Sequence, residues 1–146
     1  MVRPATVEDL DVLVRMGQDF HGSTPYADEL SSNPERFGAI GRRLIEDPAG
    51  VLFLRERAGC PVGMLGAMVF DHPLSGERTV GELFWWIDPK HRGDAGVRLL
   101  RTLEAWARDQ GATRLQMIQP VWAEHVGRIY QTLGYKPIEV AWTKRL

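Results

Sequence analysis

Apolar residues recur at helical spacing in two segments near the start of the chain. Thr6 is placed to cap the first helix, and Asp9, three residues further on, completes a weak form of the capping box. Asn33 and Pro34 begin the second helix, because Asn caps a helix well and Pro suits its first position. The segment 22–26 breaks the pattern between them. The beginning of the chain therefore predicts two consecutive helices.

A meander of three strands is predicted next. The run 51–54 is apolar at every position, which is typical of a strand buried on both faces. Turns at 59–61 and 72–77, rich in Gly and Pro, separate it from strands over 62–70 and 79–87.

The rest of the chain predicts two more helices and two more strands. The core face of a long helix is carried by Leu100 and Leu103, and a last helix ends at Gly134. Strands are expected over 114–119 and over 137–145. With a first strand at the N-terminus, the order is β-α-α-β-β-β-α-β-α-β, an α/β (α+β) mixed sheet in three layers.

Composition narrows the class of protein. A chain of 146 residues suits a single domain over 1–146, and 44% apolar with 25% charged residues is the balance of a soluble globular protein. A net charge of −1 gives no electrostatic case for nucleic acid, and no run approaches the roughly 18 apolar residues of a membrane span. The lone Cys60 excludes an internal disulfide, and the four histidines are scattered, so we expect no metal. The N-terminus shows no signal peptide, which makes the cytoplasm the expected location.

The most informative segment is the stretch 82–117, and within it the turn 91–97, which joins the strand over 79–87 to the long helix. A strand that leads through small residues into a helix N-terminus presents backbone N–H groups to an anion, and the helix dipole favours negative charge there. Arg92 and Arg98 add donors for a phosphate. The residues alone leave an alternative open, namely an ordinary strand-to-helix turn capped by Asp94.

The whole chain resembles the GNAT superfamily of acetyl-CoA-dependent N-acetyltransferases, and the resemblance covers nearly all of it. Three groups of residues carry it: Val2-Arg3-Pro4-Ala5-Thr6 with Glu8-Asp9-Leu10, Ile87-Asp88-Pro89 with Arg92-Gly93, and Tyr130 with Leu133-Gly134-Tyr135. The family loop reads Arg/Gln-x-x-Gly-x-Gly/Ala. Counted from Arg92, its two glycine positions hold Ala95 and Val97, with Gly96 between them, so this pyrophosphate loop departs from the family pattern.

The resemblance implies a GNAT-like fold and acetyl-CoA as co-substrate. It assigns the cofactor to the end of a strand and the loop after it: Ile87, Arg92, Gly93, Asp94, Ala95, Gly96, Val97 and Arg98. The main chain at Ile87 is expected to pair with the pantetheine like a short strand.

Two side chains are candidates for the chemistry of acyl transfer. Glu82 is a carboxylate in an apolar strand, where partial burial raises the pKa toward a value suited to a general base. A solvent-facing Glu, or one paired with Arg78, is the alternative. The resemblance assigns Tyr130 as the acid that protonates the departing sulfur, by its spacing to Gly134. A core tyrosine with a satisfied hydroxyl remains the alternative.

The preferred function is transfer of an acetyl group from acetyl-CoA to a primary amine, by direct attack in a ternary complex. The resemblance places residues 20–26 and the loop 72–77 at the amine pocket, and it allows a homodimer because strand edges in such domains often pair. Two other functions are compatible with parts of the pattern. One is a non-catalytic module of the same fold that binds or senses acyl-CoA. The other is a nucleotide-binding α/β protein, ranked last because both glycine fingerprints of nucleotide loops are missing.

Overall fold

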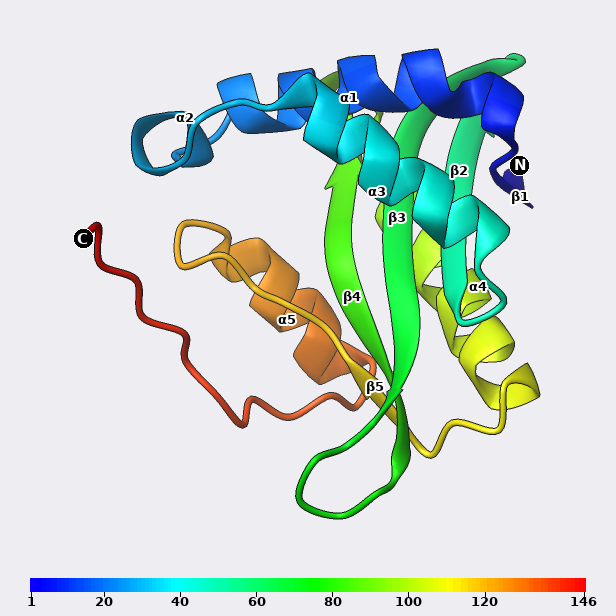
Figure 1. The fold of residues 1–146 in the computed structure, drawn as a ribbon, viewed down its shortest axis with the longest axis vertical. Helices are drawn as coiled ribbons and strands as arrows, with labels where there is room; N and C mark the ends of the chain where they lie inside the picture. The colour runs from blue at the N-terminus through cyan, green and yellow to red at the C-terminus, as the bar shows by residue number, and fades with distance from the viewer.

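A five-stranded mixed sheet in the order β1-β2-β3-β4-β5 forms the centre of the computed structural model, which describes residues 1–146 (Figure 1). The strands are β1 (Val2–Pro4), β2 (Gly50–Arg57), β3 (Cys60–Asp71), β4 (Arg78–Ile87) and β5 (Arg114–Gln116). The pairs β1–β2, β2–β3 and β3–β4 are antiparallel, and β5 runs parallel to β4. The predicted mixed α/β class is confirmed.

Several helix boundaries coincide with caps that the sequence predicts. They are α1 (Leu10–Gly22), α2 (Tyr26–Glu29), α3 (Pro34–Glu46), α4 (Asp94–Asp109) and α5 (Glu124–Thr132), with 3-10 turns η1 (Val7–Asp9) and η2 (Pro89–His91). The Asn33 side chain accepts a 2.9 Å hydrogen bond from the Arg36 N–H at the start of α3. Gly111 and Gly134 follow α4 and α5 with φ angles of 74° and 89°, a left-handed conformation that favours glycine. The short helix α2 was not predicted.

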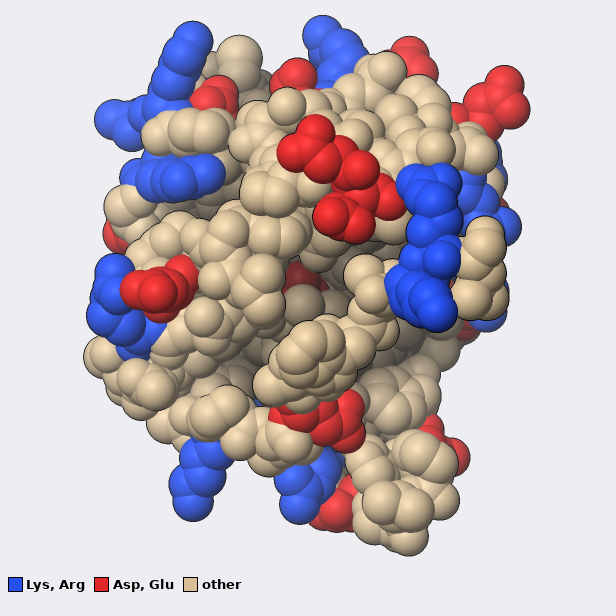
Figure 2. Space-filling view, turned by 90° about the vertical axis from the view of Figure 1, so that its left-hand side faces the viewer, with Lys and Arg blue, Asp and Glu red and all other residues tan.

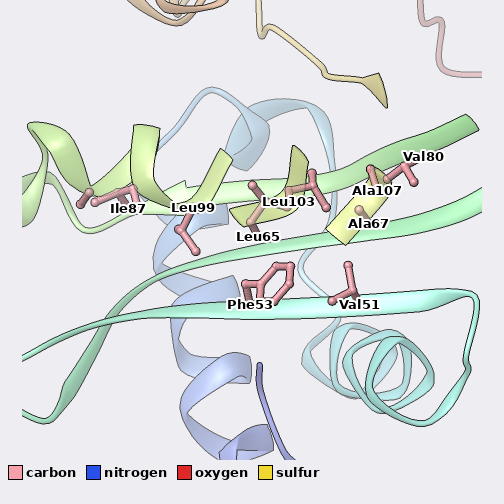
Figure 3. Close-up of a cluster of buried hydrophobic side chains, with 10 residues drawn as sticks. Val51, Phe53, Leu65, Ala67, Val80, Ile87, Leu99, Leu103 and Ala107 are labelled. Atoms are coloured by element: carbon pink, nitrogen blue, oxygen red, sulfur yellow. The ribbon is translucent and has the colours of Figure 1, made fainter. Parts of the chain in front are cut away.

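The two faces of the sheet bury separate apolar clusters, which makes three layers. Helix α4 covers one face, where its Leu99 and Leu103 contact Phe53 and Leu65 (Figure 3). Helices α1 and α3 cover the other face, where Leu13 and Leu44 pack against strand residues. Strand β2 contributes to both clusters, as its continuous apolar run predicts.

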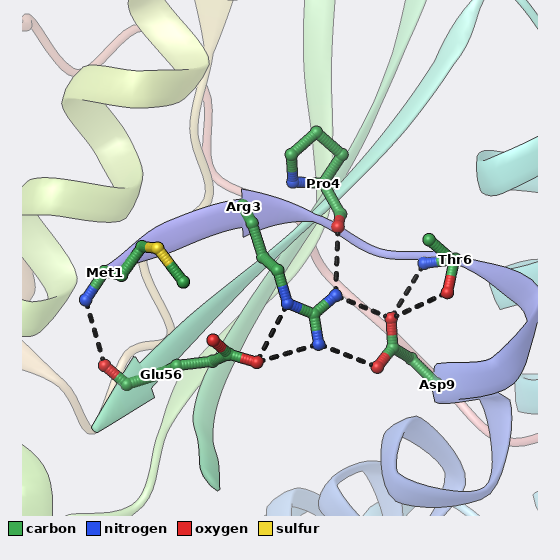
Figure 4. Close-up of polar contacts among 6 residues, drawn as sticks. All are labelled: Met1, Arg3, Pro4, Thr6, Asp9 and Glu56. Carbon is green, nitrogen blue, oxygen red and sulfur yellow. Dashed lines mark hydrogen bonds and ion pairs between the residues drawn. The ribbon is translucent and has the colours of Figure 1, made fainter. Parts of the chain in front are cut away.

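A charged contact fastens the N-terminal strand to the rest of the sheet (Figure 4). The Arg3 guanidinium donates to both carboxylate oxygens of Asp9, at 2.8 and 2.9 Å, and its Nε donates to Glu56 at 2.8 Å. Asp9 also accepts from the backbone N–H of Thr6, as in the predicted capping box. One guanidinium thereby joins β1, η1 and β2.

Strand β4 contains a β-bulge beside the functional site. Ala67 of β3 lies opposite Glu82, and Gly66 lies opposite Phe84, so Leu83 is an extra residue without a partner. The bulge shifts the alternation of side chains. Before it, Val80 packs on the α4 side of the sheet, and after it Trp85, an odd number of residues further on, packs on the same side. Residues at even positions of β4 therefore face α4 before Leu83, and residues at odd positions face α4 after it.

The terminal strand expected over 137–145 is absent. Residues 136–146 form no helix or strand, all of them are exposed, and their one hydrogen bond joins Arg145 to the carbonyl of Glu29. The tail runs beside α5 and away from the sheet (Figure 1). A strand requires a neighbouring strand for its backbone hydrogen bonds, and within this chain the segment has none. Strand β5 is also shorter than the predicted 114–119.

Candidate active site

The site lies where strands β4 and β5 separate. The two strands pair only from Thr79 to Gly81, opposite Arg114 to Gln116. Beyond Gly81, no strand pairs with β4 on its β5 side, although β4 continues to Ile87. The separation leaves backbone groups of a central strand open to a ligand, which is the setting for strand-like addition of an extended molecule.

Glu82 occupies the point of separation. The residue is half-buried, and its carboxylate accepts a 2.8 Å hydrogen bond from the backbone N–H of Ile118. Loss of solvent raises the pKa of Glu82 to about 7, although the Ile118 hydrogen bond acts in the opposite direction. The predicted alternative of a pair with Arg78 does not occur, because the Arg78 Nε donates to the carbonyl of Gln110.

Tyr130, on α5, is hydrogen-bonded to the same backbone residue as Glu82. Its hydroxyl donates a 2.8 Å hydrogen bond to the carbonyl of Ile118, and its ring packs between Trp85 and Tyr135, with centroids 5.8 and 5.5 Å away. Burial, followed by the charge of Glu82, raises the pKa of Tyr130 well above its usual value, so the phenol stays protonated. The side chain is buried and lies outside the set that lines the adjoining pocket.

A pocket of about 390 Å³ extends from Glu82 in two directions. It passes along β4 from Glu82 to Ile87 and reaches the start of α4 at Arg92, Gly93 and Gly96. In the other direction it reaches the end of α1 and the loop before α5. Figure 2 shows this side of the molecule hollowed, with acidic side chains gathered at the rim and another within. One pocket thus connects the carboxylate with the predicted anion site.

The start of α4 fits a phosphate-bearing ligand. Gly93 has φ 101° and ψ −127°, a conformation that favours glycine, and a Cβ there would meet open space, so the main chain is accessible. The first N–H groups of α4 have no partner within the helix. Arg92 and Gly93 line the pocket together with Gly96, whose absent Cβ would lie 2.9 Å from the Trp85 ring. We therefore find the loop compatible with the diphosphate of acetyl-CoA.

Four of the predicted cofactor residues lie apart from the pocket. Asp94 does not cap α4, since Gly93 holds that position, and its carboxylate pairs instead with Arg98 on the helix surface. Ala95 is buried in the cluster beneath α4. Val97 is half-buried and outside the pocket lining, so its branched side chain does not narrow this pocket.

The opposite end of the pocket is aromatic. Tyr26 of α2 makes edge-to-face contacts with Phe20 and with Trp122, at centroid distances of 5.6 and 4.9 Å. Both ends of the segment 20–26 line the pocket, as the resemblance implies, whereas none of the loop 72–77 does.

Sequence reasoning missed two residues of this site. Ile118 acts through its backbone, which no side-chain pattern reveals. Trp122 could not be assigned from the sequence, because its contact with Tyr26 joins distant parts of the chain. No cluster of His, Cys, Asp and Glu in the chain could hold a metal ion, and none of its helices has the length and apolar character needed to cross a bilayer.

Comparison with known proteins identifies the class. The model of the acetyltransferase (GNAT) family matches residues 13–135, so the chain belongs to this family of acetyltransferases and the resemblance is confirmed. The rat (Rattus norvegicus) protein N-acetyltransferase 8 is 26% identical over 98 residues. That match covers 66% of this chain and 44% of the rat protein, so the chain spans less than half of that relative's length.

Solved structures share the fold across the whole chain. A tetramutant of the BH1408 protein from Bacillus halodurans has a TM-score of 0.82 at 17% identity, covering 100% of this chain and 99% of its own. An aminoglycoside acetyltransferase from an uncultured soil metagenomic sample has a TM-score of 0.78 at 13% identity, covering 100% and 95%. At these identities the likeness concerns the fold alone.

Proposed function

We propose that the protein transfers an acetyl group from acetyl-CoA to a primary amine by direct attack in a ternary complex. One observation carries the proposal: a carboxylate with a pKa of about 7 lies in a pocket that also reaches the N-terminus of α4. Family membership supports acetyl transfer in general. Cys60 lies exposed at the start of β3, away from the pocket, so no residue suggests a covalent relay.

Acetyl-CoA supplies an acetyl thioester, an acyl donor that an uncharged amine attacks directly. Arg92, Gly93 and Gly96 would hold its diphosphate, and the unpaired backbone of β4 near Ile87 would hold its pantetheine arm. The other predicted cofactor residues, Asp94, Ala95, Val97 and Arg98, lie in the first two turns of α4. Of these, Asp94 and Arg98 neutralise each other on the surface, and they contribute less than Arg92.

Glu82 serves as the general base. A carboxylate with a pKa of about 7 is half-ionised at neutral pH, and it is more basic than an ordinary glutamate. It takes the proton from the amine, directly or through one water, while its hydrogen bond from Ile118 fixes its orientation. The same carboxylate attracts a cationic amine into the pocket before that proton is lost.

Tyr130 is the proposed acid that returns a proton to the thiolate. Its high pKa keeps the phenol protonated at neutral pH. Its hydroxyl is engaged by the Ile118 carbonyl, so the transfer requires that this hydrogen bond be exchanged for one to sulfur. If no exchange occurs, Tyr130 positions Ile118, and thereby Glu82, without transferring a proton.

Thiol release tests the proposal. The protein is incubated with acetyl-CoA and a panel of primary amines that includes an aminoglycoside, a polyamine and a peptide with a free N-terminus, and free CoA is followed with a thiol reagent. We expect amine-dependent release, reduced about 100-fold or more in Glu82→Gln. The matched control is Glu46→Gln, the same change on the exposed surface of α3, which should be fully active.

The competing function is a non-catalytic module that binds acyl-CoA. The engagement of the Tyr130 hydroxyl by Ile118 favours it. Thermal unfolding combined with thiol release separates the two. Both functions predict that acetyl-CoA at 100 times its dissociation constant stabilises the protein by about 2.7 kcal/mol, and only the enzyme also releases thiol. Stabilisation by acetyl-CoA without turnover on any amine would support the module. Absence of stabilisation at millimolar acetyl-CoA would reject both functions.

A further inference from the structure

The acceptor end of the pocket, the part that extends from Glu82 away from α4, is built from aromatic rings. Phe20, Tyr26 and Trp122 form a row in which each ring meets the next edge to face, at centroid distances of 5.6 and 4.9 Å. All three line the pocket, although they come from α1, α2 and the loop before α5. Rings arranged in this way can receive a further aromatic ring in the same geometry.

Leu83 adds an apolar side chain to the same pocket. The bulge in β4 leaves this residue without a partner on β3, and its side chain is 42% exposed where it lines the pocket. Trp122 is exposed to a similar extent, at 40%. Large apolar side chains that stay accessible inside a concave surface are typical of a ligand site, because a bound molecule covers them.

Negative charge inside the pocket is confined to one carboxylate. Glu82 is the only acidic residue of the lining, and the one guanidinium, that of Arg92, lies at the α4 end. Burial, followed by the charge of Glu82, raises the pKa of Tyr26, so the carboxylate lies within electrostatic reach of the aromatic row. One carboxylate can pair with one ammonium, and a second ammonium held among the rings would lose water without gaining a counter-charge.

The acidic side chains at the rim do not change this count. They lie on the outer surface around the hollow (Figure 2). Asp28 and Glu29, which follow Tyr26 in α2, are exposed and lie outside the pocket lining. Salt screens exposed charges beyond roughly 8 Å at physiological ionic strength. Charges at the rim therefore attract cations in general, and the pocket itself selects among them.

We propose that the acceptor at this site is a primary monoamine that carries an aromatic group, with its ammonium at Glu82 and its ring against Tyr26 and Trp122. The assignment rests on the proposed acetyl transfer and names the class of amine that the site selects. Polyamines and aminoglycosides carry several ammonium groups and no aromatic ring, so they fit this end poorly. Tyr26 and Trp122 are then residues that determine specificity.

Calorimetry tests the class of amine without turnover, because protein saturated with CoA holds no acetyl group to transfer. Phenylethylamine is the probe. Ethylamine lacks its ring, and diaminopentane has a second ammonium in place of the ring. We expect phenylethylamine to bind about 10-fold or more tightly than either comparison amine, since it alone buries a ring and leaves no charge unpaired.

A change at Trp122 tests the assigned position of the ring. Trp122→Ala should weaken the binding of phenylethylamine about 10-fold and change that of ethylamine by less than about 2-fold. The matched control is Trp142→Ala, the same change at a tryptophan that is 92% exposed and outside the pocket, which should change neither affinity by more than about 2-fold. Trp122→Phe keeps a ring at this position and should retain most of the selectivity.

The outcomes separate this proposal from acetyl transfer itself. Equal affinities for the three amines, tighter binding of diaminopentane, no binding of phenylethylamine at millimolar concentration, or selectivity that survives in Trp122→Ala would each overturn the aromatic acceptor. Acetyl transfer would still stand if another amine released thiol from acetyl-CoA. Selective binding of phenylethylamine without thiol release on any amine would instead reject acetyl transfer and retain the aromatic row as a ligand site.

Discussion

Glu82 and Tyr130 are hydrogen-bonded to the same residue: the carboxylate of Glu82 accepts from the N–H of Ile118, and the hydroxyl of Tyr130 donates to its carbonyl. The proposed base and the proposed acid are therefore oriented by one short piece of backbone. That backbone lies just beyond the end of β5, where the pairing with β4 has stopped. A displacement of Ile118 would change both groups together.

The pH dependence of catalysis should report the pKa of Glu82. Because only the carboxylate accepts a proton, kcat/KM should rise with pH up to about 7 and then level off. The measurement is a pH profile with an amine acceptor whose own pKa lies outside this window. In Glu82→Gln the residual kcat/KM should not rise with pH in this range. A rise that persists in Glu82→Gln would show that another group titrates there.

Glu82 should also make the folded state less stable at high pH. The folded pKa of about 7 lies above the unfolded value, so the folded protein binds the proton more tightly. The contribution of Glu82 is fully present below about pH 4 and is lost as pH rises through 7, by up to about 3 kcal/mol. The free energy of unfolding of Glu82→Gln, relative to that of the wild type, should therefore be higher at pH 8 than at pH 5. Urea unfolding at the two values measures it, and equal differences would contradict the buried carboxylate.

Tyr130→Phe distinguishes the two roles of the phenol. Loss of a general acid should lower kcat by about 100-fold or more, with an unchanged dissociation constant for acetyl-CoA. If Tyr130 only positions Ile118, its removal would free Ile118 to move and weaken the hydrogen bond to Glu82. The pH at which kcat/KM levels off would then shift. Single-turnover rates and the pH profile of the variant, taken together, decide between them.

The loop before α4 should depend on glycine at position 93. Gly93→Ala forces a side chain into a conformation that favours glycine, at a cost of about 1–3 kcal/mol. Gly59→Ala is the control, because Gly59 also has positive φ and open space around it but lies in the β2–β3 turn. Both variants should lose stability, and only Gly93→Ala should also weaken acetyl-CoA binding, by about 10-fold. Calorimetry measures these affinities. Equal acetyl-CoA affinities of Gly93→Ala and the wild type would show that Gly93 is not part of the cofactor site.

The sequence predicted the features that depend on local order. The turn 91–97, the carboxylate at Glu82 and the caps at Asn33 and Gly111 follow from residue type and spacing. The bulge at Leu83 could not be predicted, because a bulge depends on pairing between strands and leaves no fixed signature in one of them.

Contacts between distant segments also could not be predicted from the sequence. The bond from Ile118 to Glu82 involves a backbone group, and backbone groups are the same in every residue. The tail shows the opposite failure. Its alternation is typical of a strand, yet a strand forms only beside a partner, and residues 137–145 pair with no strand in this structure.

The Arg3–Asp9 contact predicts a loss of stability in acid. The Arg3 guanidinium lowers the pKa of Asp9 to about 2, so the ionised carboxylate favours the folded state. This contribution is present above the unfolded pKa near 4 and is lost as pH falls through 2. Asp9→Asn should cost about 1–3 kcal/mol at pH 7, and the difference from the wild type should shrink between pH 4 and pH 2. The control is Asp11→Asn, the same change on an exposed residue of α1 that forms no ion pair. Urea unfolding at several pH values measures both, and an Asp9→Asn deficit that stays constant down to pH 2 would show that packing, and not the charge, holds β1 to the sheet.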